Sequence, residues 1–256
     1  MTPSRLQLVA LPGIPLVKPG DDLAGLVLTA IAAAGERLAT GDVLVLAQKV
    51  FSKAEGRYAD LNAIDPSPQA RDLATKADKD PRMVELILSE SSEVLRHRPG
   101  VIVVAHRLGF VMANAGIDAS NVEPIAGEER VLLLPDDPDR SCAALRDRLH
   151  AETDAEVAVV MNDSVGRAWR QGIVGIALGA AGLPSLLDLN GRVDLFDRPL
   201  MATQVGLADE IASAASLLQG QADEGHPAVL LRGLEIAAGN AGASSLIRPE
   251  TEDLFR

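Results

Sequence analysis

The sequence predicts a fold that mixes β-strands and α-helices, of the α/β or α+β class. Short apolar runs typical of buried strands, such as Val43–Leu46 and Val157–Met161, are separated by segments whose apolar residues recur at helical spacing, such as Leu23–Ile31 and Ala208–Leu218. The connections between these segments are short. At 256 residues, the chain is long enough to bury a core as one large domain or as two small ones. The pattern does not fix the order of the strands.

The N-terminal third follows this pattern. Apolar residues from Leu6 to Val17 surround a Pro-Gly-Ile-Pro turn, and Asp21 and Asp22 stand where they can cap the first helix. Gly41 and Asp42 form a turn before the first buried strand. We expect Ser67–Arg98 to be helical, with Pro81 opening its second part.

In the rest of the chain, expected strands, helices and loops also follow one another at short intervals. A Gly-rich stretch, Gly172–Gly182, has no clear periodicity, Gly220–Pro227 is expected to form a loop, and the residues after Gly233 are expected to be extended. Strands are expected at Val101–Ala105, Phe110–Ala113, Val131–Leu134 and Ala228–Leu231, and a helix at Ser141–Leu149.

The composition narrows the class of protein. A net charge of −12 argues against non-specific nucleic-acid binding, although metal ions and a few cationic side chains could still allow a polyphosphate to bind. Cys142 is the single cysteine, so an intramolecular disulfide and a cysteine-based zinc site are excluded. No secretory signal pattern and no run of 18 apolar residues occur. We expect a cytoplasmic enzyme that does not bind membranes.

Two segments near the N-terminus could contact a ligand. The Pro12-Gly13-Ile14-Pro15 segment allows close backbone approach to a ligand, but taken alone it is better explained as a structural turn. After the first buried strand come Gln48, Lys49, Ser52 and Lys53, and a lysine at such a position can meet a phosphate; the alternative is a solvated turn. Neither a P-loop nor a GxGxxG motif is present.

Two later segments hold candidate metal ligands. Asp118 and Asn121 lie three residues apart, shortly after Gly116, with no Lys or Arg nearby in the sequence. Their oxygens suit Mg²⁺ or Mn²⁺, and an Asx-turn or a helix cap is the alternative. Asp163 and Ser164 end a buried strand, as in enzymes that hold a metal ion beside a nucleotide.

The residues after Asp163 add two guanidinium groups. Arg167 and Arg170 could clamp a phosphate or a carboxylate, or one of them could pair structurally with Asp188 or Asp194. Trp169, the only tryptophan, could pack in the core or stack on a ligand. Simpler explanations hold elsewhere: Asp136, Asp137 and Asp139 form a turn and a helix cap, Cys142 is a packed thiol, and the four histidines lack metal-site spacing.

Together and in this order, these segments resemble the F420-0:γ-glutamyl ligase family over nearly the whole chain. The matching segments are Leu11–Asp22, Gly41–Val45, Ser52–Arg57, Asn114–Val122, Leu133–Asp139, Asn162–Arg170, Ala208–Ile211, Gly220–Pro227 and Arg248–Arg256. The resemblance implies an α+β fold, a single ligase domain over residues 1–256 with two subdomains as an option, an intertwined homodimer, and no C-terminal nitroreductase-like domain.

The resemblance also implies a ligand set. One divalent ion, Mg²⁺ or Mn²⁺, would be held by Asp118 and Asp163, and a second by Ser164 and Gln221; a K⁺ ion is a further option. Gln221 departs from the glutamate usual in the family, which would weaken the second ion's site. Val165 and Ala168 replace the usual Phe and Pro. GTP would lie against Pro12, Gly13, Ile14, Pro15, Gln48, Lys49, Ser52, Lys53, Asn121, Gln219, Gly220, Gln221, Ala222, Asp223, Glu224, Gly225 and His226.

The implied activity is GTP-dependent amide formation. GTP would convert the terminal carboxylate of coenzyme F420-0 into an acyl phosphate, which the amine of L-glutamate would attack, and a second glutamate could follow. The catalytic residues would be Asp118, Asp163, Arg167 and Arg170. Two other functions stay open: a related nucleotide-dependent ligase with a different acceptor, and a non-catalytic nucleotide-binding regulator.

Overall fold

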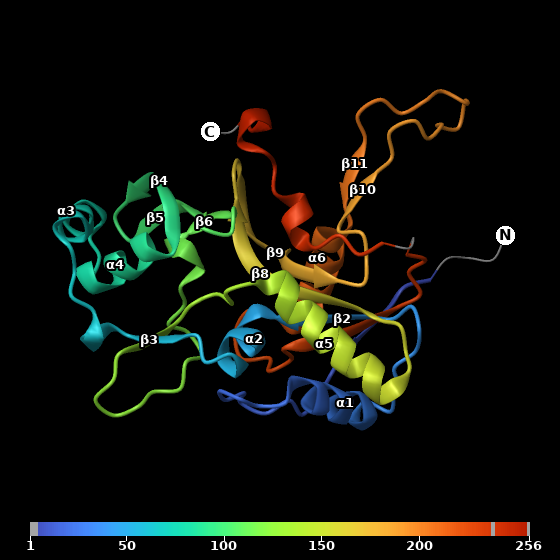
Figure 1. Ribbon diagram of the computed structural model, residues 1–256, viewed down its shortest axis with the longest axis horizontal. Coiled ribbons are helices and arrows are strands. Elements are labelled where there is room, and N and C mark those ends of the chain that lie inside the picture. The colour runs from blue at the N-terminus through green and yellow to red at the C-terminus, as the bar shows by residue number, and fades with distance from the viewer. Residues whose placement is uncertain (1–4, 237–238, 255–256) are drawn as a thin grey trace.

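A five-stranded mixed sheet forms the centre of the computed structural model, which describes residues 5–236 and 239–254 (Figure 1). β2 and β8 pair in parallel, and the other neighbouring strands of this sheet are antiparallel. The strands run across the sheet in the order β1 (Gln7–Ala10), β12 (Ala228–Arg232), β2 (Val43–Ala47), β8 (Ala158–Arg167) and β9 (Arg170–Ala181).

Helices cover both faces of this sheet, which explains why its inner strands are apolar throughout. Leu44 and Leu46 of β2 belong to one buried cluster with residues of α1 (Leu23–Ala33), α2 (Gln48–Ala54) and α5 (Pro138–Thr153). Val43 and Val45 point to the opposite face and pack with α6 (Leu207–Gln219). The predicted mixture of helices and strands is confirmed. Asp22 occupies the N-cap position of α1 but makes no side-chain capping bond.

A smaller lobe has a hydrophobic cluster of its own. In it, α3 (Pro68–Ala77) and α4 (Pro81–Ser89) pack on a three-stranded sheet of β4 (Ser91–Arg98), β5 (Val101–His106) and β6 (Val111–Ala113). Ser67 and Asp80 cap the two helices, and a proline follows each of them. β3 (Tyr58–Asp60) pairs with β7 (Arg130–Leu132) in a separate ribbon.

The prediction that the chain is helical as far as Arg98 is wrong, because β4 occupies Ser91–Arg98. Gly100 adopts a positive φ of 84°, which turns the chain back so that β4 pairs antiparallel with β5. β4 is an edge strand with two register irregularities, and most of its residues are exposed. Such a strand shows neither clean alternation nor a buried apolar run, so the strand signal is weak.

The Gly-rich stretch forms most of β9, a strand that its residue pattern does not predict. Its glycines permit close packing: a Cβ at Gly179 would lie 2.4 Å from the Pro138 carbonyl oxygen of α5. A Cβ at Gly175 would lie 2.6 Å from the Ala212 carbonyl oxygen of α6. Small residues are therefore required here by helices that cross the strand closely.

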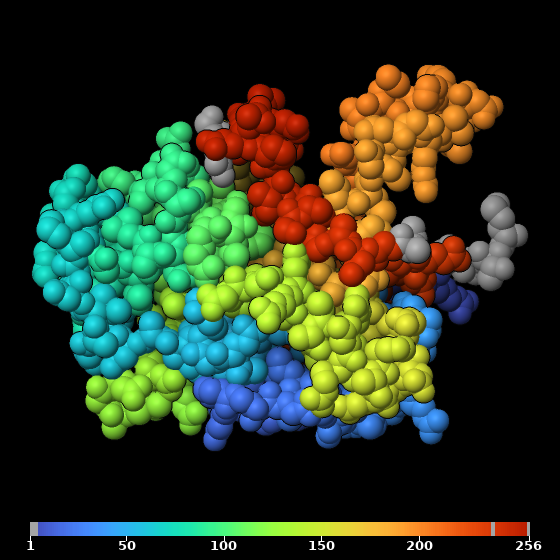
Figure 2. Space-filling view, viewed as in Figure 1, coloured from blue at the N-terminus to red at the C-terminus, as the bar shows by residue number. Residues whose placement is uncertain are grey.

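Two strands carry an arm that projects from the body of the molecule (Figures 1 and 2). β10 (Leu186–Asp188) and β11 (Gln204–Gly206) pair antiparallel at its base. The segment after Gly233 is not simply extended, because it includes short 3₁₀ turns at Ala243–Leu246 and Glu250–Glu252; the last two residues of the matching C-terminal segment lie outside the described residues. In the described part of the chain, no helix is long and apolar enough to span a bilayer.

Candidate active site

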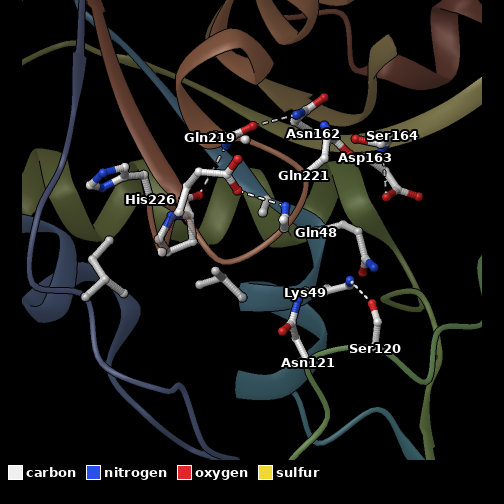
Figure 3. Close-up of a pocket in the computed structure, with 18 of the residues that line it drawn as sticks. Gln48, Lys49, Ser120, Asn121, Asn162, Asp163, Ser164, Gln219, Gln221 and His226 are labelled. Carbon is white, nitrogen blue, oxygen red and sulfur yellow. Dashed lines mark hydrogen bonds between the residues drawn. The ribbon is translucent and has the colours of Figure 1, made fainter. Parts of the chain in front are cut away.

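A cavity of about 630 Å³ opens where β2 ends beside the middle of its parallel neighbour β8 (Figure 3). The predicted end of the strand at Asp163 and Ser164 is wrong, because β8 continues to Arg167 in its pairing with β9. Ala47, the last residue of β2, pairs with Asn162 on β8, so the residues that follow β2 emerge beside the part of β8 that follows Asn162. Ligands of open sheets bind at such carboxyl ends, because the chain there is free of ladder pairing. The volume is within the range of small-molecule sites.

Helix α2 begins directly after β2 and places two lysines in the cavity wall, one helical turn apart. The alternative of a solvated turn at Ser52 and Lys53 is wrong, since both belong to this helix. Ser52 is fully buried and its hydroxyl donates a 2.8 Å hydrogen bond to Oε1 of Gln48. Ser52 thus orients the side chain of Gln48 without lining the cavity itself.

The two lysines hold the segment around Asp118 against α2. Lys53 Nζ donates a hydrogen bond to the Asn121 carbonyl oxygen at 2.6 Å, and Lys49 Nζ donates one to Ser120 Oγ at 2.9 Å. Burial, reinforced by repulsion from Lys49, lowers the pKa of Lys53. The wall therefore presents two cations close together, as an anionic ligand requires.

Asp118 has a cationic partner that its sequence neighbours do not supply. Lys49 Nζ lies 2.6 Å from Asp118 Oδ2. The backbone amide of Ser120 donates a 2.6 Å hydrogen bond to Asp118 Oδ1, so Asp118 also forms the Asx-turn that was the alternative to a metal ligand. Burial raises the pKa of Asp118, but the hydrogen bonds from Lys49 and Ser120 outweigh it and lower the pKa below its ordinary value. The carboxylate stays ionised near neutral pH.

Asp163 faces the same cavity from β8 (Figure 3). Burial raises its pKa to about 6, while the Ser164 amide and the Lys49 ammonium oppose the shift and Asp118 adds to it. The Lys49 ammonium is therefore a cation that interacts with both carboxylates, at a place where hard oxygen ligands converge.

The polar residues of the cavity fit a divalent ion whose coordination shell is completed by substrate oxygens and water. The described residues contain no group of three or more His, Cys, Asp or Glu side chains able to hold a metal. Mg²⁺ is commonly bound by one or two carboxylates together with substrate phosphates and water. Asp118 and Asp163 supply two carboxylates, and Ser164 and Gln221 line the same cavity.

The loop after α6 closes another side of the cavity. Gln219 anchors its start: Nε2 donates to the Pro227 carbonyl at 3.2 Å, and Oε1 accepts from Asn162 Nδ2 at 2.6 Å (Figure 3). Gly220 adopts a φ of 72°, which the loop requires as it leaves the helix. His226 Nδ1 is buried and has no hydrogen-bond partner in the described part of the chain, which leaves it free for a ligand.

Comparison with known proteins shows the family of the chain. The sequence model of the family described as F420-0:Gamma-glutamyl ligase matches residues 13–233. The chain belongs to this family. The prediction made from its ordered motifs is confirmed.

Individual relatives match over nearly their full lengths. The chain is 46% identical to the "Coenzyme F420:L-glutamate ligase" of Methanothermobacter thermautotrophicus over 253 residues, covering 98% of this chain and 99% of the relative. It is 47% identical to the protein of that name from Methanopyrus kandleri, covering 94% and 93%. The Archaeoglobus fulgidus protein of that name is 42% identical, covering 98% and 97%.

The cavity brings together most of the residues predicted from the sequence. Pro12, Gly13 and Ser52 do not line it, although Ser52 contacts Gln48, which does. The predicted residues that line it are Ile14, Pro15, Gln48, Lys49, Lys53, Asp118, Asn121, Asp163, Ser164, Gln219, Gly220, Gln221, Ala222, Asp223, Glu224, Gly225 and His226.

Arg167 and Arg170 lie outside the cavity lining, at the exposed end of the β8–β9 hairpin, where they pair across the strands. The alternative of a structural ion pair is wrong for the described residues: Asp194 pairs with Arg198, and neither arginine has an ion pair. Trp169 is 90% exposed, so packing in the core is excluded. The part of these residues in the reaction stays a prediction.

Sequence reasoning missed eight residues of the cavity wall, three of which are polar or come from β9. Ser120 binds Lys49, Asn162 binds Gln219, and Ile173 lines the cavity from β9. Ser120 and Asn162 stand next to the predicted residues Asn121 and Asp163, so adjacency could have suggested them. Ile173 had no signal, because β9 itself was not predicted. Asp137, by contrast, caps α5 as expected, and Cys142 is fully buried.

Proposed function

We propose that the chain is a GTP-dependent ligase that joins L-glutamate to coenzyme F420-0, giving F420-1 and, if the reaction repeats, F420-2. The observation that carries this proposal is the convergence of two carboxylates, Asp118 and Asp163, with two lysines, Lys49 and Lys53, in one cavity. Phosphoryl transfer requires such a site, because cations must offset the charge of the transferred group. Family membership and the names of the relatives support the choice of substrates.

The chemistry follows from the poor leaving ability of a carboxylate oxygen. One oxygen of the acceptor carboxylate attacks the γ-phosphorus of GTP, the bond to the β-phosphate oxygen breaks, and GDP leaves. The acyl phosphate then reacts with the amine of glutamate, which forms the amide bond, expels phosphate and releases a proton. Lys49 and Lys53, which line the cavity, would bind phosphate oxygens in the first step.

Asp118 and Asp163 would hold one divalent ion, Mg²⁺ or Mn²⁺, and Ser164 and Gln221 a second. When bound, such ions neutralise charge on the phosphates and on the acceptor carboxylate. A K⁺ ion is a further part of the proposal that rests on the family resemblance alone.

Product formation from purified components tests the proposal. The chain is incubated with GTP, L-glutamate, F420-0 and Mn²⁺ or Mg²⁺, and products are identified by mass spectrometry. We expect a gain of one glutamyl unit per GDP and phosphate released. GTP use that requires a different acceptor would identify a related ligase, and GTP binding without turnover would identify a regulator.

Gln221→Glu is expected to lower the Mn²⁺ concentration needed for half-maximal activity, by roughly threefold to tenfold, because a carboxylate binds a hard cation better than an amide. Gln221→Met removes the oxygen altogether and serves as the opposite control, with a higher Mn²⁺ requirement. Activity against Mn²⁺ concentration measures both. If Gln221→Glu leaves the requirement unchanged, Gln221 does not ligate the second ion.

Arg167→Lys and Arg170→Lys are expected to raise the KM for F420-0 or glutamate by roughly tenfold, with a smaller change for GTP. Lysine keeps the charge but loses the bidentate guanidinium contact with a carboxylate or phosphodiester. Steady-state kinetics with each substrate varied in turn measure the effect. A change confined to the KM of GTP would assign these arginines to the nucleotide.

A homodimer is also part of the proposal, and the arm between β10 and β11 supports it. Leu195 is 97% and Phe196 75% exposed at the end of this arm, which is unusual for large apolar side chains. Leu195→Asp combined with Phe196→Asp is expected to convert the dimer to a monomer, measured by light scattering after gel filtration. A dimer that persists in this variant would show that the arm does not hold the subunits together.

A further inference from the structure

We propose that the tip of the β8–β9 hairpin binds the acceptor, with the aromatic ring of F420-0 stacked on Trp169 and its phosphodiester held by Arg167 and Arg170. This inference rests on the proposed function and assigns to it the part of the molecule that selects the acceptor.

Trp169 is an unusual residue for its position. It has a φ of 65° in the two-residue turn between Arg167 and Arg170, a conformation that costs a bulky side chain more than it costs glycine or asparagine. Its side chain is 90% exposed and packs on no core cluster of the described residues. A strained backbone and an exposed indole contribute nothing to the stability of the fold. Such a residue is best explained by a flat ligand that covers the ring.

The hairpin leads directly from the cavity to this tip. On β8, Asp163 and Ser164 line the cavity, and exposure rises along the strand to Arg167. On β9, Ile173 lines the cavity, is 51% exposed and pairs with Gly166, the residue before Arg167. An acceptor whose carboxylate lies beside Asp163 can therefore extend along the hairpin without leaving the surface of the protein.

The spacing suits the acceptor's chemistry. Arg167 follows Asp163 by four residues, about 13 Å in an extended strand. In F420-0, a phosphodiester lies near the carboxylate that is activated, and a polyol separates both from the fused aromatic ring. Arginine side chains are long enough to reach back from the tip toward a phosphodiester, whereas the ring would come to lie farther out, at Trp169.

The charge of the tip is complementary to this ligand. The chain has a net charge of −12, yet neither guanidinium at the tip has an ion pair among the described residues. Two uncompensated arginines beside an exposed tryptophan are suited to a ligand that is both anionic and aromatic. The base of the nucleotide is a poorer candidate for stacking on Trp169. The lysines proposed to bind the nucleotide's phosphates lie on α2 and line the cavity, whereas the hairpin tip lies outside the cavity lining.

Steady-state kinetics of Trp169→Ala and Trp169→Phe test the assignment, with F420-0, GTP and glutamate varied in turn. We expect Trp169→Ala to raise the KM for F420-0 at least about tenfold, as loss of a stacking side chain does for other flat ring systems. The KM for GTP should stay within about twofold, and Trp169→Phe should restore most of the affinity. A second acceptor, in which a methyl group replaces the polyol and ring but the phosphodiester and carboxylate remain, should be used equally well by wild type and Trp169→Ala.

Three results would overturn the assignment while leaving the proposed function intact: an unchanged KM for F420-0 in Trp169→Ala, an equal loss with the ring-free acceptor, or conversion of a dimer to a monomer, which would show that a second copy of the chain covers the indole. A wild-type protein that forms no product from F420-0 would overturn the proposed function, and the assignment with it.

Discussion

Asp163→Asn is expected to lower kcat at least about 100-fold, because it removes a charge that phosphoryl transfer needs while keeping the shape of the side chain. Folding should not suffer. The pKa of Asp163 is raised to about 6 chiefly by burial, so the carboxyl is still mostly ionised at neutral pH but its charge costs the folded protein stability there. A neutral amide avoids this cost, and the melting temperature in metal-free buffer should be equal or higher.

Asp118→Asn is expected to lose a similar factor in kcat but to behave differently in thermal unfolding. Its carboxylate pairs with Lys49 at 2.6 Å, and both side chains are partly exposed, so loss of the pair should cost at most about 1 kcal/mol. Asp65→Asn is a suitable control, because Asp65 has a side chain that is 97% exposed and lies outside the cavity lining. Near-normal turnover in either cavity variant would remove that residue from the proposed metal site.

The local part of the fold could be read from the sequence, because its causes are local. Ser67, Asp80 and Asp137 each precede a proline and cap a helix, and this signal needs no knowledge of the rest of the chain. Buried strands such as β2 were recognised because helices cover both of their faces. The edge strand β4 and the glycine-rich β9 were missed, because edge exposure and close helix packing erase the usual apolar pattern.

Individual residues of the candidate site could be predicted from the sequence, but their proximity in space could not. Asp163 and Ser164 were found because they follow the buried part of a strand, and the residues of α2 because they begin where another strand ends. That these residues lie side by side is a consequence of the parallel pairing of β2 with β8, which the pattern did not reveal. The contact between Lys49 and Asp118 is likewise invisible in the sequence, since it joins segments that only the fold brings together.

Because of its contact with Asp118, Lys49 is expected to oppose metal binding, whereas Lys53 is not. Lys49 Nζ lies 2.6 Å from Asp118 Oδ2 and interacts with Asp163, so a divalent ion held by these carboxylates must displace the ammonium. Lys53 Nζ instead donates to the Asn121 carbonyl oxygen. Once displaced, Lys49 is free to bind phosphate, so metal and nucleotide binding should favour each other.

Lys49→Met is therefore expected to bind Mn²⁺ about threefold to fivefold more tightly in the absence of nucleotide, the effect of removing one partly exposed ion pair. The same variant should raise the KM for GTP roughly tenfold or more, because a charged hydrogen bond to phosphate is lost. Lys53→Met is the matched control: it should weaken GTP binding to a similar extent without tightening Mn²⁺. Calorimetric titration with Mn²⁺ alone and steady-state kinetics with GTP separate the two effects. If Lys49→Met binds Mn²⁺ no better than wild type, the ammonium does not stand in the ion's place, and Asp118 and Asp163 must bind a metal without displacing it.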